Sequence, residues 1–325
     1  MVDAHYDLLS ICYVCYLKHD YTLMEKIKEE IEKSGVKCIF ANLYFMSKEE
    51  MIYELHPNYY DEKVSILEMF KISKAILEKY LPNVDFIYSI EGCDYLDIND
   101  LNKLYNEGLR SILLVWNCEN KYGSGNRTNK GLTKEGIEFL NRAIELGIGI
   151  DLSHANKPTF YGMIEVIKEN QNKGKEVICY ATHSNSRTLC NRERNLDDNQ
   201  IKKIKEVGGL IGLISNRNFV TSNHDLSKEK QRKEYLKHII YVEQLIGIDN
   251  IMLSTDDMRF SGEIDPVYYE LPIFDYDNIV KETESALKVY YDSDDIDKII
   301  YKNAYTKIVN KLRNNYKNNS LINKK

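Results

Sequence analysis

Residues 133–154 read TKEGIEFLNRAIELGIGIDLSH, and this stretch contains the step from helix to strand that decides the fold. Thr133 is a favourable N-cap for a helix that the pattern ends at Leu146. Ile148–Ser153 is an apolar run of strand length, and it is followed at once by His154. Apolar runs that alternate with helical segments are typical of a parallel sheet.

The same alternation runs outward from this stretch along the whole chain of 325 residues. Helical segments are also visible over Ser47–Leu55, Glu62–Tyr80 and Lys228–Leu245. The candidate strands are Val2–Asp7, Lys37–Leu43, Val84–Glu91, Ser111–Trp116, Ile148–Ser153, Val177–His183, Gly209–Ser215 and Asn250–Asp256. Eight strands with intervening helices predict a closed (β/α)8 TIM barrel, although the strand count alone also allows an open, doubly wound sheet. We expect one domain over residues 1–312 and a polar, disordered tail over residues 313–325.

Charge and composition exclude several classes of protein. The net charge is −6 and no basic stripe stands out, which argues against nucleic-acid binding. The apolar run Leu8–Leu17 is too short to span a bilayer, and the start of the chain lacks the basic residues of a signal peptide. Seven scattered cysteines fit a reducing compartment. We therefore expect a cytoplasmic protein without a membrane span.

Polar residues that can bind metal fall where several predicted strands end. In a (β/α)8 barrel the active site lies at the carboxyl ends of the strands. His5 and Asp7 are two residues apart, so on a strand they point to the same side. Glu91, His154 and His183 end or follow three further apolar runs. Taken singly, Glu91 also fits a helix-capping carboxylate, and each histidine also fits a hydrogen-bonded structural residue.

The distribution of histidines favours a shared site. Three of the seven end predicted strands, whereas the others are interpreted as structural or exposed, namely His19, His56, His224 and His238. Imidazole and carboxylate ligands without thiolates suit zinc, with manganese, cobalt or iron as alternatives. Two such ions about 3.5–4 Å apart would activate a shared water molecule. Asp256 could handle the protons of that water or cap the segment that follows, and Asp257 is the weaker candidate.

In this order, the motifs resemble those of the membrane (renal) dipeptidase family of metallopeptidases. The matching segments are residues 3–7 (DAHYD), 89–92 (SIEG), 131–136 (GLTKEG), 151–154 (DLSH), 182–186 (THSNS), 191–195 (NRERN) and 301–304 (YKNA). Each segment alone is weak, but the ordered combination covers nearly the whole chain and is specific.

The resemblance implies a role for each matching residue. His5, Asp7 and Glu91 would hold one divalent ion, and Glu91, His154 and His183 would hold a second, with Zn²⁺ favoured. Asp256 would orient or deprotonate a hydroxide that bridges the ions and attacks a peptide carbonyl. Arg194 would bind the carboxylate of a small, dipeptide-like substrate, and its alternative is an ion pair with Glu193 or Asp197. The oligomeric state is left open, and a homodimer is one option.

Two segments depart from the family pattern. Residues 114–117 read LVWN, so Trp116 stands where the family has a histidine that contacts the substrate. Residues 254–259 read STDDMR and keep the first aspartate of the family segment without its glycines. The metal ligands are kept while the substrate side is altered. Two further hypotheses therefore stay open: a divergent amide hydrolase with another small substrate, and a catalytically weak metal-binding protein.

Overall fold

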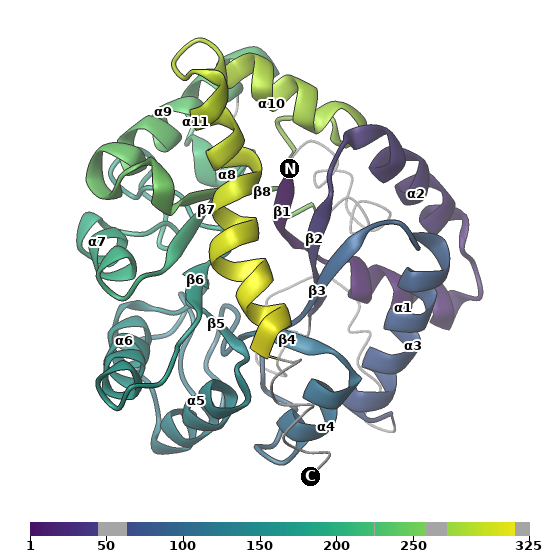
Figure 1. The fold of residues 1–325 in the computed structure, drawn as a ribbon, viewed down its shortest axis with the longest axis vertical. Coiled ribbons are helices and arrows are strands. Elements are labelled where there is room, and N and C mark those ends of the chain that lie inside the picture. Colours follow the sequence, from purple (N-terminus) through teal and green to yellow (C-terminus); the bar gives the residue numbers. More distant parts are fainter. Residues whose placement is uncertain (45–63, 224, 258–271, 316–325) are drawn as a thin grey trace.

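The computed structural model describes residues 1–44, 64–223, 225–257 and 272–315, and it has the predicted (β/α)8 architecture. Eight parallel strands close into a barrel in chain order, and helices surround them (Figure 1). The strands are β1 (Val2–Tyr6), β2 (Cys38–Tyr44), β3 (Asp85–Glu91), β4 (Leu109–Leu113), β5 (Gly149–Asp151), β6 (Cys179–Ala181), β7 (Leu210–Ile214) and β8 (Ile251–Ser254). The closed order rules out the open, doubly wound sheet.

Helices connect the successive strands around the outside of the barrel, and two more follow the last strand. They are α1 (Leu8–Lys18), α2 (Thr22–Ser34), α3 (Ile66–Tyr80), α4 (Asp100–Glu107), α5 (Lys134–Leu146), α6 (Lys157–Asn172), α7 (Asp198–Glu206), α8 (Arg217–Val220), α9 (Lys228–Ile246), α10 (Ile279–Leu287) and α11 (Ser293–Asp297). The hydroxyl of Thr133 accepts a hydrogen bond from the backbone N–H of Gly136, as expected of the N-cap of α5. The predicted helix Ser47–Leu55 and residues 316–325 of the predicted tail lie outside the described residues, as do His56 and His224.

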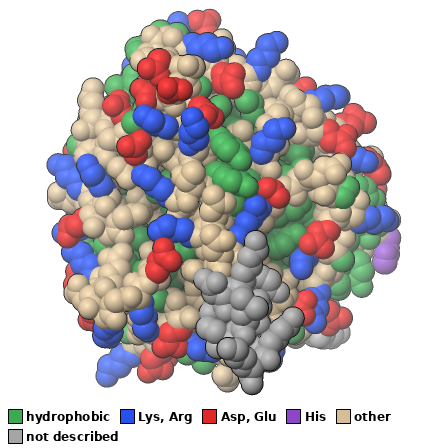
Figure 2. Space-filling model, in the orientation of Figure 1, with side chains coloured by type: hydrophobic (Ala, Val, Ile, Leu, Met, Phe, Trp, Pro, Cys, Tyr) green, Lys and Arg blue, Asp and Glu red, His purple; other side chains and the backbone are tan. Residues whose placement is uncertain are grey.

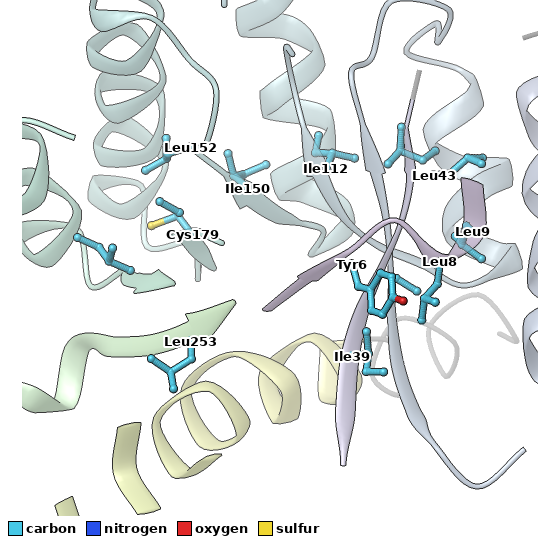
Figure 3. Packing of buried hydrophobic residues seen from close by; sticks show 14 of the residues in the cluster. Tyr6, Leu8, Leu9, Ile39, Leu43, Ile112, Ile150, Leu152, Cys179 and Leu253 are labelled. Carbon is cyan, nitrogen blue, oxygen red and sulfur yellow. The ribbon is translucent and has the colours of Figure 1, made fainter. Parts of the chain in front are cut away.

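Two apolar clusters hold the barrel together. The larger one packs the outer faces of the strands against the helices, and Figure 3 shows part of it, including Ile39, Ile112 and Ile150. The smaller one fills the amino-terminal end of the barrel with residues such as Val2, Phe40 and Met252. The last helical segment of the chain packs Ala304, Ile308, Val309 and Leu312 against this inner cluster, and Figure 1 shows it crossing that end in yellow. The opposite end is therefore the one available for a site.

A β-bulge in β1 decides which side chains face the interior. The register with β2 advances three residues from Asp3 to Tyr6 while β2 advances only two. Ala4 belongs to the inner cluster, whereas Tyr6 packs in the outer one. Because of the extra residue, the consecutive side chains of Ala4 and His5 both face the interior of the barrel. Bulges often redirect a side chain in this way beside active sites. His5 and Asp7 thereby share the interior side, as their spacing predicts.

The described helices, one face of the surface and the cysteines bear on the expectations drawn from composition. Within the described part of the chain, no helix combines the length and the apolar character that a membrane crossing requires. On the face seen in Figure 2, lysine and arginine side chains are interspersed with aspartate and glutamate, so that face carries no continuous basic surface. All seven cysteines are buried free thiols. Cys12 and Cys15 lie in α1, and burial raises the pKa of Cys12 well above its usual value, which opposes thiolate chemistry.

Candidate metal centre

The five predicted metal ligands meet at the carboxyl end of the barrel. His5 lies in β1 and Asp7 follows it, Glu91 is the last residue of β3, and His154 and His183 follow β5 and β6. All five are buried. Asp7 stands at the N-cap position of α1, yet its side chain caps no backbone N–H. The carboxylate of Asp7 is therefore free to bind a metal ion, since it does not cap α1.

Glu91 lies between two sets of nitrogen atoms. Its Oε2 is 2.9 Å from Nε2 of His5, and its Oε1 is 2.9 Å from Nε2 of His154 and 3.6 Å from Nε2 of His183. Asp7 Oδ1 is 3.5 Å from Nε2 of His5. Each carboxylate oxygen therefore faces a different group of donors, which is the arrangement of a carboxylate that bridges two cations.

Two buried oxygens in this cluster lack hydrogen bonds. Among the described residues, neither Oδ1 of Asp7 nor Oε1 of Glu91 accepts a hydrogen bond of good geometry, although Nε2 of His5 lies 3.5 Å from the first and Nε2 of His154 lies 2.9 Å from the second. A buried polar atom left without a partner costs about 1–3 kcal/mol, so two of them in one cluster point to an additional binding partner. A donor set of imidazoles and carboxylates without thiolates fits a divalent cation such as Zn²⁺. The helix-capping alternative for Glu91 does not fit, because the next helix begins only at Asp100.

The histidines carry different charges in the absence of a cation. Burial lowers the pKa of His154 to about 3, and burial together with the positive charge of His5 lowers the pKa of His183 well below its usual value. Both rings are therefore neutral, which is the form that binds metal. Burial also acts to lower the pKa of His5, but Glu91 and Asp7 outweigh it and raise that pKa well above its usual value.

Backbone strain is concentrated at this site. Among the described residues, only His19, His154 and Asp256 combine a side chain with positive φ, and the values at His154 and Asp256 are 64° and 50°. A left-handed conformation costs a non-glycine residue on the order of 1–3 kcal/mol, and such residues cluster at functional sites. Two of the three strained residues are thus ones that the sequence singled out.

Asp256 faces the cluster from the segment that follows β8. Its Oδ1 is 3.7 Å from Nε2 of His5, and its backbone N–H donates to the carbonyl of His5 at 3.0 Å. Burial, reinforced by the nearby charges of Asp7 and Glu91, raises the pKa of Asp256 to about 7. A carboxylate with a pKa near neutrality can both take up and release a proton. The segment that it would otherwise cap lies outside the described residues.

Arg194 is buried beside the site, between β6 and α7. Its guanidinium donates to Oγ of Ser184 at 3.0 Å and to the carbonyl of His183 at 2.6 Å. Its Nε has no partner within the described part of the structure. The surface ion pair considered from the sequence is not formed in the described structure, since Glu193 lies near Arg187 and Asp197 near Lys157. A buried cation with an unused donor suits an anionic ligand.

Trp116 lines the same end of the barrel. Its ring lies 4.8 Å from the ring of Tyr44 and 6.0 Å from the ring of His154, measured between centroids. The next residue, Asn117, contacts Nδ1 of His154 through Oδ1 at 3.1 Å. Gly125 holds this loop close, because a Cβ there would lie 1.9 Å from the carbonyl oxygen of Trp116. Trp116 therefore lies beside the proposed metal ligand His154.

The sequence reasoning assigned no role to three further residues at the site. Asn117 contacts His154, while Thr182 contacts both His5 and His183 and is bonded to the buried Asp151. The sequence did contain one indication of a role for Asp151, because it is a carboxylate at the end of an apolar strand. Its partner could not be predicted, because the pairing with Thr182 joins β5 to β6.

Comparisons with known proteins bear on the family and the fold. A family model described as membrane dipeptidase (peptidase family M19) matches residues 49–321. An uncharacterized protein of the pqqA 5′ region of Klebsiella pneumoniae is 30% identical over 193 residues, which cover 57% of this chain and 68% of that protein. An uncharacterized protein of the PQQ-III 3′ region of Acinetobacter calcoaceticus is 31% identical over 166 residues, which cover 48% of this chain but only 50% of that relative.

A solved structure shares the fold over nearly the full length. A metallo peptidase from Rhodobacter sphaeroides, liganded with a phosphinate mimic of the dipeptide L-Ala-D-Ala, superposes with a TM-score of 0.73 at 19% identity. The superposition covers 96% of this chain and 98% of that protein. The family model begins after β1, so the placement of His5 and Asp7 beside Glu91 is an independent observation. The match over residues 49–321 shows that the chain belongs to the membrane dipeptidase family, a family of metallopeptidases.

Proposed function

We propose that this chain is a dinuclear metal-dependent hydrolase of dipeptides, with zinc as the favoured metal. The observation that carries the proposal is the position of Glu91, whose two oxygens face separate groups of imidazole nitrogens. One cation would be held by His5, Asp7 and Glu91, and the other by Glu91, His154 and His183. Bound cations would supply Lewis acidity, which lowers the pKa of water and polarises a carbonyl.

The protein's own residues supply the remaining steps. Asp256 accepts a proton from the attacking water and returns it to the leaving amine, a role for which its place beside His5 and the other proposed ligands suits it. Arg194 binds the free carboxylate of the substrate and fixes the distance between that carboxylate and the scissile bond. The buried strands of the barrel keep the proposed ligands in place during the reaction.

The decisive assay measures amino-acid release from a panel of L,L- and L,D-dipeptides with added zinc. Release that disappears with a chelator and returns with zinc supports the proposal. Protein that is loaded with metal yet hydrolyses no dipeptide would instead favour one of two alternatives, another small amide substrate or a metal-binding protein with little catalytic power. The tryptophan at position 116 is the observation that favours an altered substrate.

Metal content gives the first prediction. Protein purified without chelator should carry two divalent cations per chain, because two separate groups of donors face the oxygens of Glu91. Elemental analysis after gel filtration measures the ratio of metal to protein. A chain that reproducibly retains no metal, even after incubation with zinc, would contradict the dinuclear site.

Arg194 gives the second prediction. Replacing Arg194 by lysine should raise KM for dipeptides with a free carboxylate roughly 10- to 100-fold, because a charge-assisted hydrogen bond contributes about 1.5–3 kcal/mol. Dipeptide amides, which lack that carboxylate, should show little change. Arg192→Lys is the matched control, since Arg192 is an exposed arginine in the same loop. Equal losses for acids and amides would contradict the assignment.

A further inference from the structure

The hydroxyl of Thr182 contacts two of the proposed ligand histidines at once. Its Oγ1 lies 2.7 Å from Nδ1 of His183 and 3.3 Å from Nδ1 of His5. The two rings come from β1 and from the end of β6, and their centroids are 3.7 Å apart. In the proposed site these histidines serve different cations, so Thr182 is a common neighbour of both metal positions.

Asp151 determines the direction of these hydrogen bonds. It is completely buried, and its Oδ1 accepts the backbone N–H of Ser153 at 2.9 Å and that of Thr182 at 3.0 Å. Its Oδ2 forms a short hydrogen bond with Oγ1 of Thr182. An ionised carboxylate only accepts, so the single hydroxyl proton of Thr182 is donated to Asp151. The two lone pairs of the hydroxyl are then left to accept from the two Nδ1–H groups.

We propose that Thr182, held by Asp151, is a shared positioning residue that keeps both His5 and His183 protonated at Nδ1. When a ring is neutral, its Nε2 lone pair then faces the side of Glu91, where a cation would bind. The inference rests on the proposed function for its metal ligands. Outer groups of this kind fix the tautomer and orientation of metal-binding histidines, and their loss usually weakens metal binding 10- to 100-fold, an order-of-magnitude expectation.

A different outer residue contacts His154, whose Nε2 lies 3.0 Å from Nε2 of His183. Nδ1 of His154 is 3.1 Å from Oδ1 of Asn117, in the loop that follows β4. Removing the amide of Asn117 should therefore weaken only the cation that His154 holds. Removing the hydroxyl of Thr182 should weaken both. This difference separates a shared role from a general loosening of the site.

Two variants and two controls test the tautomers. Thr182→Val removes the hydroxyl at nearly constant volume, and Thr182→Ser restores it. Asp151→Asn places an amide donor opposite Oγ1 and so reverses the hydrogen bond. Thr255→Val is the matched control, because Thr255 also donates a buried hydroxyl to a buried carboxylate, that of Asp3, whereas its contact with His5 is to the backbone carbonyl and not to the ring. His238 is the internal reference, since its Nε2 faces the carbonyl of Val220 and its Nδ1 accepts from the N–H of Ser186.

The first readout is long-range ¹H–¹⁵N NMR of histidine rings in the full-length, metal-free chain. Wild-type protein and the Thr182→Ser and Thr255→Val variants should show His183 protonated at Nδ1 and His238 protonated at Nε2. Thr182→Val and Asp151→Asn should shift His183 toward the Nε2–H tautomer and leave His238 unchanged. A wild-type His183 with its proton on Nε2, or one that does not respond to Thr182→Val, would overturn the inference.

The second readout is a zinc titration of the same proteins. Thr182→Val should weaken both binding steps roughly 10- to 100-fold, Asn117→Ala only one, and Thr182→Ser neither. Weakening of a single step by Thr182→Val would refute the shared role. A wild-type chain that binds no zinc but shows the tautomer dependent on Thr182 would contradict the proposed function and support the tautomer assignment. The two failures are therefore distinguishable.

Discussion

Replacing Glu91 by glutamine is expected to remove both cations together and to abolish dipeptide hydrolysis. The amide that replaces one oxygen cannot bind a cation, and the remaining oxygen carries no negative charge. Since Oε2 faces His5 and Oε1 faces His154 and His183, each cation loses its shared anionic ligand. The affinity for each should fall by more than about 100-fold, which exceeds the usual effect of losing an outer hydrogen-bonding group.

Zinc titration of the folded variant measures this effect, and circular dichroism shows whether the barrel is intact. Glu119→Gln is the control, because Glu119 pairs only with Lys130 in an exposed salt bridge among the described contacts. A Glu91→Gln protein that still binds one cation with wild-type affinity would show that Glu91 serves a single metal. Retention of both cations would remove Glu91 from the ligand set.

The barrel could be predicted because its strands are marked by local sequence. Each predicted strand overlaps an observed one, and the helix at residues 133–146 begins and ends where the N-cap and the loss of periodicity indicated. The strands before His154 and His183 are shorter than predicted. At these strand ends the carboxylate of Asp151 accepts the backbone N–H groups of Ser153 and Thr182, so a side chain takes the place of a backbone partner for both.

The residues around the ligands could not be predicted, because they depend on contacts between distant segments. The contact of Thr182 with His5 joins residues 177 positions apart, and Asp151 lies 31 positions from Thr182. The bulge in β1 also escaped notice, since a strand with one extra residue reads like any other strand. Residue type at the strand ends thus indicated the ligands, while their supports appeared only in the fold.

Trp116 has the features of a substrate-side wall. It is only half-buried, and its ring lies 6.0 Å from that of His154 and against Tyr44. A shifted loop that packed the indole into the barrel wall would bury the side chain, whereas Trp116 is only half-buried. An indole can donate one hydrogen bond but cannot accept or carry a proton, whereas an imidazole can do both. Ordinary dipeptides should therefore be hydrolysed slowly by the wild-type chain.

Trp116→His is expected to increase the kcat for dipeptides, by roughly 10²-fold if the new imidazole stabilises the developing oxyanion as other such donors do. The loop should accept the change, since Gly125 and Asn117 fix its backbone independently of the indole. Trp116→Phe keeps a flat apolar wall without a donor and should show no gain. Turnover is compared on the dipeptide panel at equal metal content. A wild-type kcat already above about 10 s⁻¹, an ordinary enzymatic rate, would defeat the hypothesis, as would a Trp116→His variant with full metal and no gain.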